Sequence, residues 1–136
     1  MKKLILIAAL IIVAGTIYGQ TLKKGNFVGF HVMTITLKPN VTRDQYLDFL
    51  KNKASPEDEK NFECKAYIAK GIRGECKNCI SYIMVWKTEA DRNKFFLPEG
   101  GFNELGKAVN AKIKPVIDEL EKLGTFTSKY TDWIIQ

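Results

Sequence analysis

Three cysteines and a single histidine are the residues of this chain best suited to metal or redox chemistry. Cys76 and Cys79 form a C-x-x-C pair, a spacing used by zinc sites, redox dithiols and disulfide-linked turns. Cys64 precedes the pair, and His31 is the only histidine. Which of the three interpretations holds depends on the elements that carry these residues.

Sequence periodicity predicts a strand and a long helical connection in the first half. Apolar and polar residues alternate from Phe27 to Leu37, which indicates a half-buried strand. Thr42 and Gln45 have the spacing of a capping box at a helix start. Ser55 before a proline is a second N-terminal signal, so we expect an extra helix that ends near Phe62.

The second half predicts a hairpin, further helices and a last strand. Residues 64–74 and 80–87 are expected to form the hairpin, with a bulge at Gly71. A helix starts at Thr88, another spans residues 102–123, and Gly124 is the expected left-handed cap. Residues 125–135 complete a βαββαβ order. This order predicts an α+β, ferredoxin-like sandwich: a four-stranded antiparallel sheet with helices on one face.

That topology determines which residues meet at each end of the sheet. The starts of the first two strands lie beside the ends of the last two. We therefore expect one end to gather His31, Cys64, Trp86, Tyr130 and Asp132. The C-x-x-C pair belongs at the opposite end, roughly 20–30 Å away.

This placement favours a disulfide between Cys76 and Cys79 across the hairpin tip, with Cys64 as a buried free thiol. Four zinc ligands cannot meet across a sheet, so no metal site is expected. A redox dithiol is normally activated at a helix N-terminus, whereas a strand pattern follows Cys79. A reduced turn, a redox dithiol and a metal site remain the alternatives.

The other end of the sheet is the candidate ligand-binding site. His31, Trp86, Tyr130 and Asp132 would combine a titratable imidazole, aromatic walls and a carboxylate. Such a group suits small-molecule binding or proton transfer, with His31 as the candidate catalytic residue. The alternative is a hydrogen-bonded core histidine beside a packed tryptophan.

The first nineteen residues have the pattern of a secretory signal peptide. Lys2 and Lys3 precede the apolar run Leu4–Val13, and cleavage is expected between Gly19 and Gln20. The apolar stretch is shorter than the ~20 residues that span a bilayer, so no stable membrane insertion is expected. The protein is then exported, to the periplasm or the extracellular space.

The mature chain is predicted to be one domain. Residues 20–26 form a flexible lead-in, and residues 27–136 form the domain. The net charge of +6 becomes +4 once two signal-peptide lysines are removed. Because the remaining basic residues are scattered, no nucleic-acid partner is expected.

Two segments carry a resemblance to a known family. VWKTEADRNKFF (85–96) and LKPNVTRDQYLDFL (37–50) resemble the dimeric α/β-barrel superfamily, which includes antibiotic-biosynthesis monooxygenase-like domains and heme-degrading monooxygenases. The chain is also similar to small exported bacterial members that end in Tyr-Thr-Asp-Trp, here residues 130–133. The resemblance implies a homodimer in which two sheets pack face to face.

The resemblance also bears on chemistry. Heme-degrading members use a Trp, which Trp86 matches, and a downstream His that ligates iron. No His follows Trp86, so we expect no heme and no other cofactor.

In the homodimer that the resemblance implies, Val32, Thr34 and Thr36 would face the partner subunit.

The sequence therefore predicts an exported, homodimeric α/β-barrel protein that binds a small-molecule ligand without catalysis. The alternative is a cofactor-independent monooxygenase or isomerase with His31 as the base beside Trp86.

Overall fold

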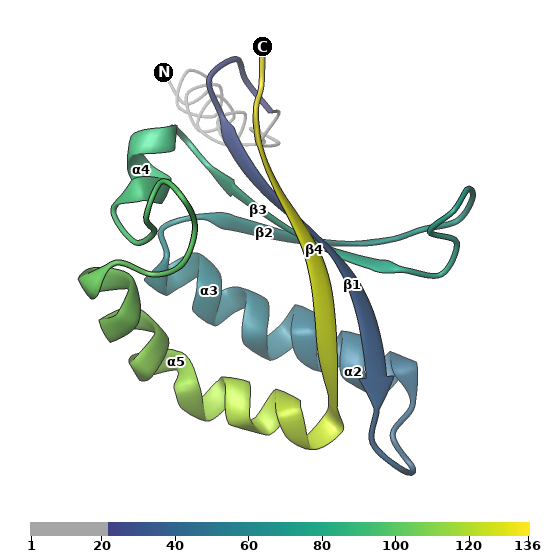
Figure 1. Cartoon of the computed structure of the whole chain (residues 1–136). Helices are drawn as coiled ribbons and strands as arrows, with labels where there is room; N and C mark the ends of the chain where they lie inside the picture. Colours follow the sequence, from purple (N-terminus) through teal and green to yellow (C-terminus); the bar gives the residue numbers. More distant parts are fainter. Residues whose placement is uncertain (1–21) are drawn as a thin grey trace, which may run out of the picture.

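The computed structural model describes residues 22–136 as an α+β fold (Figure 1). The signal-peptide prediction for residues 1–19 lies outside the described residues. The elements in chain order are β1 (Phe27–Leu37), α2 (Arg43–Phe49), the π-helical turn η1 (Leu50–Ala54), α3 (Ser55–Asn61), β2 (Lys65–Lys70), β3 (Ile80–Trp86), α4 (Glu89–Asn93), α5 (Glu104–Leu123) and β4 (Gly124–Ile134).

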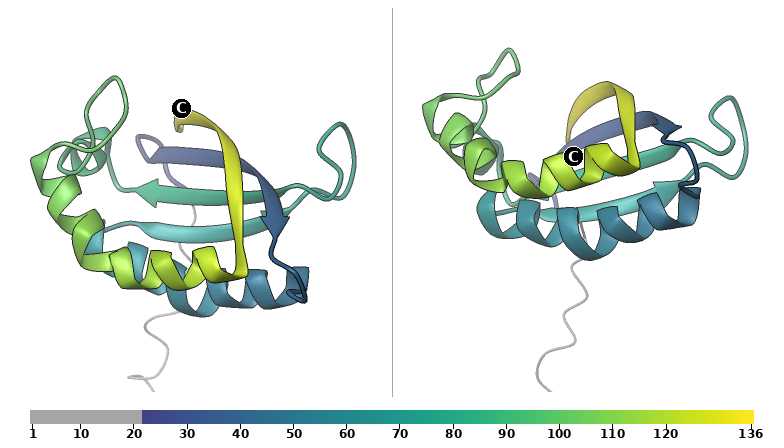
Figure 2. Two further views of the ribbon diagram at one scale, coloured as in Figure 1. Left: turned by 60° about the horizontal axis from the view of Figure 1, so that its bottom comes forward. Right: turned by 90° about the horizontal axis from the view of Figure 1, so that it is seen from below.

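The four strands form one antiparallel sheet in the order β2-β3-β1-β4. The α2–α3 segment and α5 lie side by side over one face of this sheet (Figure 2). The arrangement is compatible with the ferredoxin-like fold that the sequence predicts. β2 and β4 are the edge strands of the sheet, since each of them has only one neighbouring strand.

The helical connection after β1 starts as predicted and continues differently. Thr42 caps α2, and the capping box with Gln45 is confirmed. The extra helix that extends this connection is present as α3, but Ser55 does not cap it. Ser55 has helical backbone angles, and the π turn η1 carries the helix from α2 directly into α3. The predicted end is correct, because α3 ends at Asn61.

The hairpin between β2 and β3 is shorter than expected. β2 ends at Lys70, so Gly71 is the first residue of the connecting loop and does not form a bulge within a longer strand. A Cβ atom at Gly71 would lie 2.0 Å from the carbonyl oxygen of Cys76. Glycine is therefore required because the loop folds back onto its own backbone.

The junction between α5 and β4 also differs from the prediction. Gly124 has extended backbone angles (φ 172°, ψ 171°), so the expected left-handed cap is wrong. β4 starts at this residue, and a Cβ atom here would lie 2.8 Å from the carbonyl oxygen of Thr36. Close approach of β1 explains this glycine. Helix starts at Thr88 and Asn103 have side-chain caps, the first as predicted.

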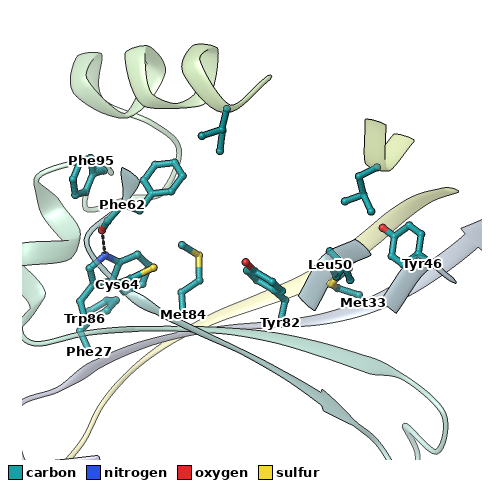
Figure 3. Close-up of a cluster of buried hydrophobic side chains, with 12 residues drawn as sticks. Phe27, Met33, Tyr46, Leu50, Phe62, Cys64, Tyr82, Met84, Trp86 and Phe95 are labelled. Carbon is teal, nitrogen blue, oxygen red and sulfur yellow. Dashed lines mark hydrogen bonds between the residues drawn. The ribbon is translucent and has the colours of Figure 1, made fainter. Parts of the chain in front are cut away.

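The core lies between the sheet and the helices (Figure 3). Trp86, Tyr46 and Ile80 are the largest fully buried side chains. Tyr82 and Met84 point from β3 towards the helical layer in Figure 3. At the N-terminal end of the described chain, Gly25 and Asn26 exchange backbone hydrogen bonds with Ile135, next to the end of β4.

Candidate functional site

A cavity of about 300 Å³ lies between the sheet and the helical layer. Its walls come from β1, β3, β4, the α2–α3 segment, the loop between α4 and α5, and α5, and most of the lining residues are apolar or aromatic. Five side chains with polar or acidic groups also line it, the Tyr82 hydroxyl among them. The residues are His31, Met33, Leu50, Ala54, Glu57, Asp58, Phe62, Tyr82, Met84, Phe96, Phe102, Asn110, Ile113, Val116, Ile117, Leu120 and Phe126.

Asp58 of α3 is a carboxyl group of the cavity wall whose pKa is raised. The Tyr82 hydroxyl donates to Asp58 Oδ2 at 2.6 Å. Burial raises the pKa of Asp58 to about 6, although the hydrogen bond from Tyr82 opposes the rise. Burial, followed by the Asp58 charge, raises the pKa of Tyr82. At neutral pH the pair therefore consists of a carboxylate and a neutral phenol.

His31 lines the same cavity from β1, halfway along the sheet. Its ring lies 4.4 Å from the ring of Tyr130, centroid to centroid, and its Nδ1 is 3.2 Å from Ser128 Oγ. Burial lowers the pKa of His31, while the charge of Asp132 acts in the opposite direction. The imidazole is therefore mainly neutral at pH 7 and able to accept a proton or a hydrogen bond.

Tyr130 and Asp132 form a network beside His31. The Tyr130 hydroxyl donates to Asp132 Oδ1, and Arg92 Nη2 lies 3.3 Å from Asp132 Oδ2. Burial and the bond to Asp132 raise the pKa of Tyr130. Arg92 is buried beneath the rings of Phe27 and Phe96, 5.7 and 5.1 Å from their centroids. This network joins the end of β4 to α4.

The four residues predicted as a site are only partly brought together. His31, Tyr130 and Asp132 form a connected group, and Trp86 and Tyr130 both border Gly29, where a Cβ atom would lie 3.3 Å from Trp86 Cζ3. His31 does not lie at the Trp86 end of the sheet as expected. Phe27 pairs with Trp86, whereas His31 pairs with Tyr82 four residues further along β1.

Trp86 does not line the cavity. Its indole is 1% exposed, and its Nε1 donates to the carbonyl oxygen of Phe62 at 2.9 Å (Figure 3). This hydrogen bond ties β3 to the segment that follows α3. Trp86 thus packs in the core, where its ring lies 5.8 Å from that of the cavity residue Phe96, centroid to centroid.

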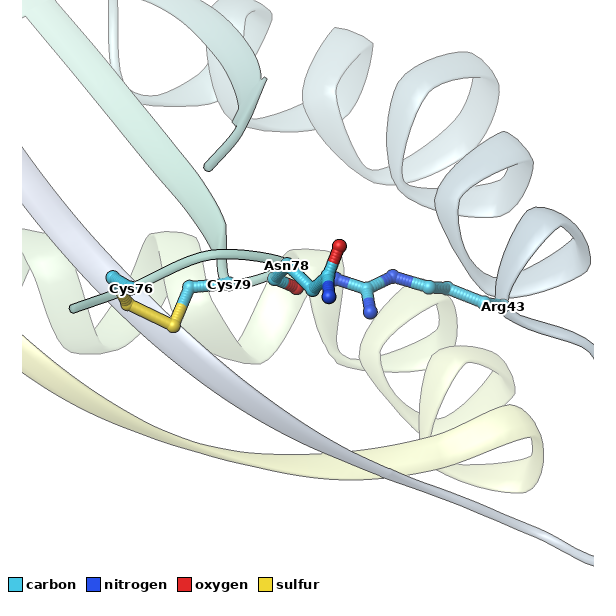
Figure 4. The surroundings of a disulfide bond; sticks show 4 residues. All are labelled: Arg43, Cys76, Asn78 and Cys79. Carbon is cyan, nitrogen blue, oxygen red and sulfur yellow. A yellow bond between two sulfur atoms is a disulfide. The ribbon is translucent and has the colours of Figure 1, made fainter. Parts of the chain in front are cut away.

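The disulfide between Cys76 and Cys79 is confirmed (Figure 4). It closes the loop between β2 and β3, and Arg43 of α2 donates to the carbonyl oxygen of Asn78 in that loop. The loop projects from the sheet at the end away from α4 (Figure 1). Cys64 is a buried free thiol, as predicted, and burial raises its pKa to about 12.

Asp58 and Tyr82 are the site residues that the sequence interpretation missed. The sequence pattern places Asp58 in the extra helix after Ser55 and Tyr82 in the strand expected over residues 80–87. Both positions carried a signal. Tyr82 alternates with the buried residues Ile80 and Met84, and Asp58 is four residues before the buried Phe62 on the same helix face. A polar group at a core position of each pattern marks a polar contact.

No protein-family model matches the chain, and no curated protein matches its sequence. Within residues 22–136, no three His, Cys, Asp or Glu side chains gather closely enough to hold a metal ion. None of the helices in that same range is both long enough and apolar enough to cross a membrane.

Proposed function

We propose that this is an exported, homodimeric binding protein that holds a small, largely apolar molecule between its sheet and its helices, without a cofactor. The observation that carries the proposal is the cavity lined by His31, of about 300 Å³. This volume is at the low end of the ~300–1,000 Å³ typical of ligand pockets. Apolar walls with a few polar groups are also typical of such pockets.

A small neutral aromatic compound, 2-phenylethanol, tests the binding proposal. We expect saturable NMR shift changes at cavity residues of the mature chain, with a Kd on the order of 1 mM for a probe of this size. Ala54→Leu places a larger side chain at the cavity wall and should weaken binding. Ala111→Leu, on the exposed side of α5, is the matched control and should bind as the wild type does.

Two results would contradict the binding proposal. One is the absence of saturable shifts at probe concentrations of about 10 mM, ten times the Kd expected above. The other is equal binding to wild type and to Ala54→Leu, which would place the probe elsewhere on the protein.

The homodimer is proposed from the sheet face opposite the helices. Phe30, Ile83 and Tyr67 lie in one cross-strand row on that face. The side chains of Tyr67 and Trp133 are 44% and 58% exposed. An apolar, uncovered sheet face is typical of a protein interface. Membership of the dimeric α/β-barrel superfamily accounts for such a face, and Val32, Thr34 and Thr36 of β1 would then contact the partner.

Export is proposed from two features. The first nineteen residues have the signal-peptide pattern. The disulfide between Cys76 and Cys79 suits the oxidising periplasm or extracellular space.

The second candidate function is the cofactor-independent monooxygenase or isomerase. The observation in its favour is that His31 lines the cavity with a lowered pKa, which suits a general base. Trp86 does not line the cavity, so it would not contact the substrate directly. Loss of turnover in His31→Gln, with probe binding retained, would favour this enzyme over a binding protein.

A further inference from the structure

We propose that the cavity selects a small amphiphilic cation: an aromatic or alkyl body that carries an ammonium group, with the carboxylate of Asp58 as its partner. The inference rests on the proposed binding function and adds the chemical class of the ligand. It follows from the charges, the hydrogen bonding and the aromatic rings of the cavity.

The charges that line the cavity are of one sign. Asp58 and Glu57 bring two carboxylates to the wall, and none of the lining residues in the described part of the chain is Lys or Arg. His31 adds no positive charge at neutral pH, because burial lowers its pKa. An ammonium group is therefore complementary to the cavity, whereas a carboxylate or phosphate would meet repulsion.

Asp58 has capacity for another hydrogen bond. Its Oδ2 accepts from Tyr82, whereas its Oδ1 has no hydrogen-bond donor among residues 22–136. Asp58 is partly buried, and burial of a carboxylate is costly unless it is paired with a positive charge. A bound ammonium group would donate to Oδ1 and supply that charge.

Aromatic rings line the same cavity as this carboxylate. Phe62 is four residues after Asp58, and its amide donates to the Asp58 carbonyl oxygen at 2.8 Å. The ring of Phe62 stacks on Phe102 with centroids 5.9 Å apart, and Phe96 lies 5.2 Å from Phe102. This wall suits a flat apolar body, and aromatic faces also attract cations. A ligand with its ammonium group a short spacer away from a ring meets both features.

The proposed contact is pH-dependent, because Asp58 must be ionised. The titratable groups around it are Glu57 on its own helix, Tyr82 of β3, Cys64 before β2 and His31 of β1. From α5, the described lining residues include the polar Asn110 but no titratable side chain. With a pKa of about 6 for Asp58, the binding-competent fraction, and with it the affinity, falls about tenfold from pH 7.5 to pH 5. Protonation of His31 over the same range would weaken cation binding further.

Calorimetric titration of the mature chain with three matched probes tests the inference. The probes are 2-phenylethylamine, neutral 2-phenylethanol and anionic phenylacetate. At pH 7.5 we expect the amine to bind about tenfold more tightly than the alcohol, as a hydrogen bond to a charged group is stronger than a neutral one. The acid should bind most weakly. Lowering the pH to 5 should remove the preference for the amine and leave the alcohol unchanged.

Two variants test whether Asp58 causes the preference for the amine over the alcohol. Asp58→Asn keeps the shape of the side chain and should bind amine and alcohol equally. Glu119→Gln removes an exposed carboxylate of α5 outside the cavity lining, and it should keep the tenfold preference.

The outcomes separate this inference from the proposed function. Alcohol binding with no preference for the amine overturns the inference alone. A preference that persists in Asp58→Asn also overturns it, since the cation would then sit elsewhere. Failure of all three probes to bind overturns both. The wild-type comparison of amine with alcohol decides the matter even if Asp58→Asn does not fold.

Discussion

Asp58→Asn should stabilise the folded protein at alkaline pH, although it replaces the charged acceptor of a 2.6 Å hydrogen bond with a neutral one. The carboxyl of Asp58 changes its pKa from an ordinary 3.8 to about 6 on folding. The folded chain therefore binds this proton more tightly than the unfolded chain, and ionisation opposes folding. Asparagine has no charge to bury and can still accept a hydrogen bond from Tyr82.

The magnitude follows from the two pKa values. At about 1.4 kcal/mol per pKa unit, burial of the ionised carboxylate costs roughly 3 kcal/mol. The amide of asparagine brings two new donors into a partly buried position, and imperfect pairing of them costs about 1 kcal/mol. We expect a net gain in the free energy of unfolding of about 2 kcal/mol above pH 7.

The pH dependence has a defined sign. A raised carboxyl pKa means that the cost is fully present above pH 6 and is relieved as the pH falls towards 4. The advantage of Asp58→Asn should therefore shrink from about 2 kcal/mol at pH 8 to zero or slightly below zero at about pH 4. Urea denaturation of both proteins across this range measures the difference at each pH.

Glu119→Gln is the control for loss of a carboxylate. Glu119 is exposed on α5, so its substitution should change stability by no more than about 0.5 kcal/mol at any pH. The reasoning is refuted if Asp58→Asn is less stable than the wild type at pH 8, or if the difference between them is independent of pH. A confirmed gain would show that the chain keeps this carboxylate at a cost in stability, as functional sites commonly do.

Three further predictions concern the rest of the chain. Alkylation of the folded protein without reductant should label at most Cys64, because the disulfide protects the other two cysteines; three labels in intact-mass analysis would contradict the disulfide. Gly106→Ala should destabilise by more than about 3 kcal/mol in urea denaturation, since its Cβ would lie 1.9 Å from the Phe95 carbonyl oxygen. Gly74→Ala, with open space but a φ of +81°, should cost only about 1 kcal/mol, and equal losses would refute the steric argument. Ile83→Glu on the outer sheet face should convert the proposed dimer to a monomer in sedimentation, whereas Ala111→Glu on α5 should not; a monomeric wild type at micromolar concentration would disprove the dimer.

Local features of the fold were readable from the sequence. Alternation in residues 27–37 reflects side chains on opposite faces of a strand, and residues 80–87 are rich in β-branched and aromatic residues; the structure has β1 and β3 there. The caps at Thr42 and Thr88 depend on residues three positions away, so they are also encoded locally. The predicted extra helix is present as α3, but Ser55 does not cap it, because the preceding helix continues through a π turn that no local signal excluded.

The candidate site could be predicted only in part, because its contacts depend on strand register. Pairing of His31 with Tyr130 follows from the order of the strands, and the predicted topology brought them near each other. Their exact neighbours depend on the strand register. In the observed register Trp86 pairs with Phe27, four residues before His31. The topology correctly predicts the end of the sheet at which Trp86 lies, but the alternation of strand residues does not reveal that its indole N–H is bound within the core.

The sequence by itself determined the strand and helix pattern, the disulfide loop and the presence of a single histidine. Each of these depends on residue type or on contacts within a few positions. Only the tertiary structure decided that Asp58 and Tyr82, 24 positions apart, share a hydrogen bond at the wall of a cavity. That contact depends on how the helical layer packs on the sheet, and packing distances between layers are set by all the side chains between them rather than by any local pattern.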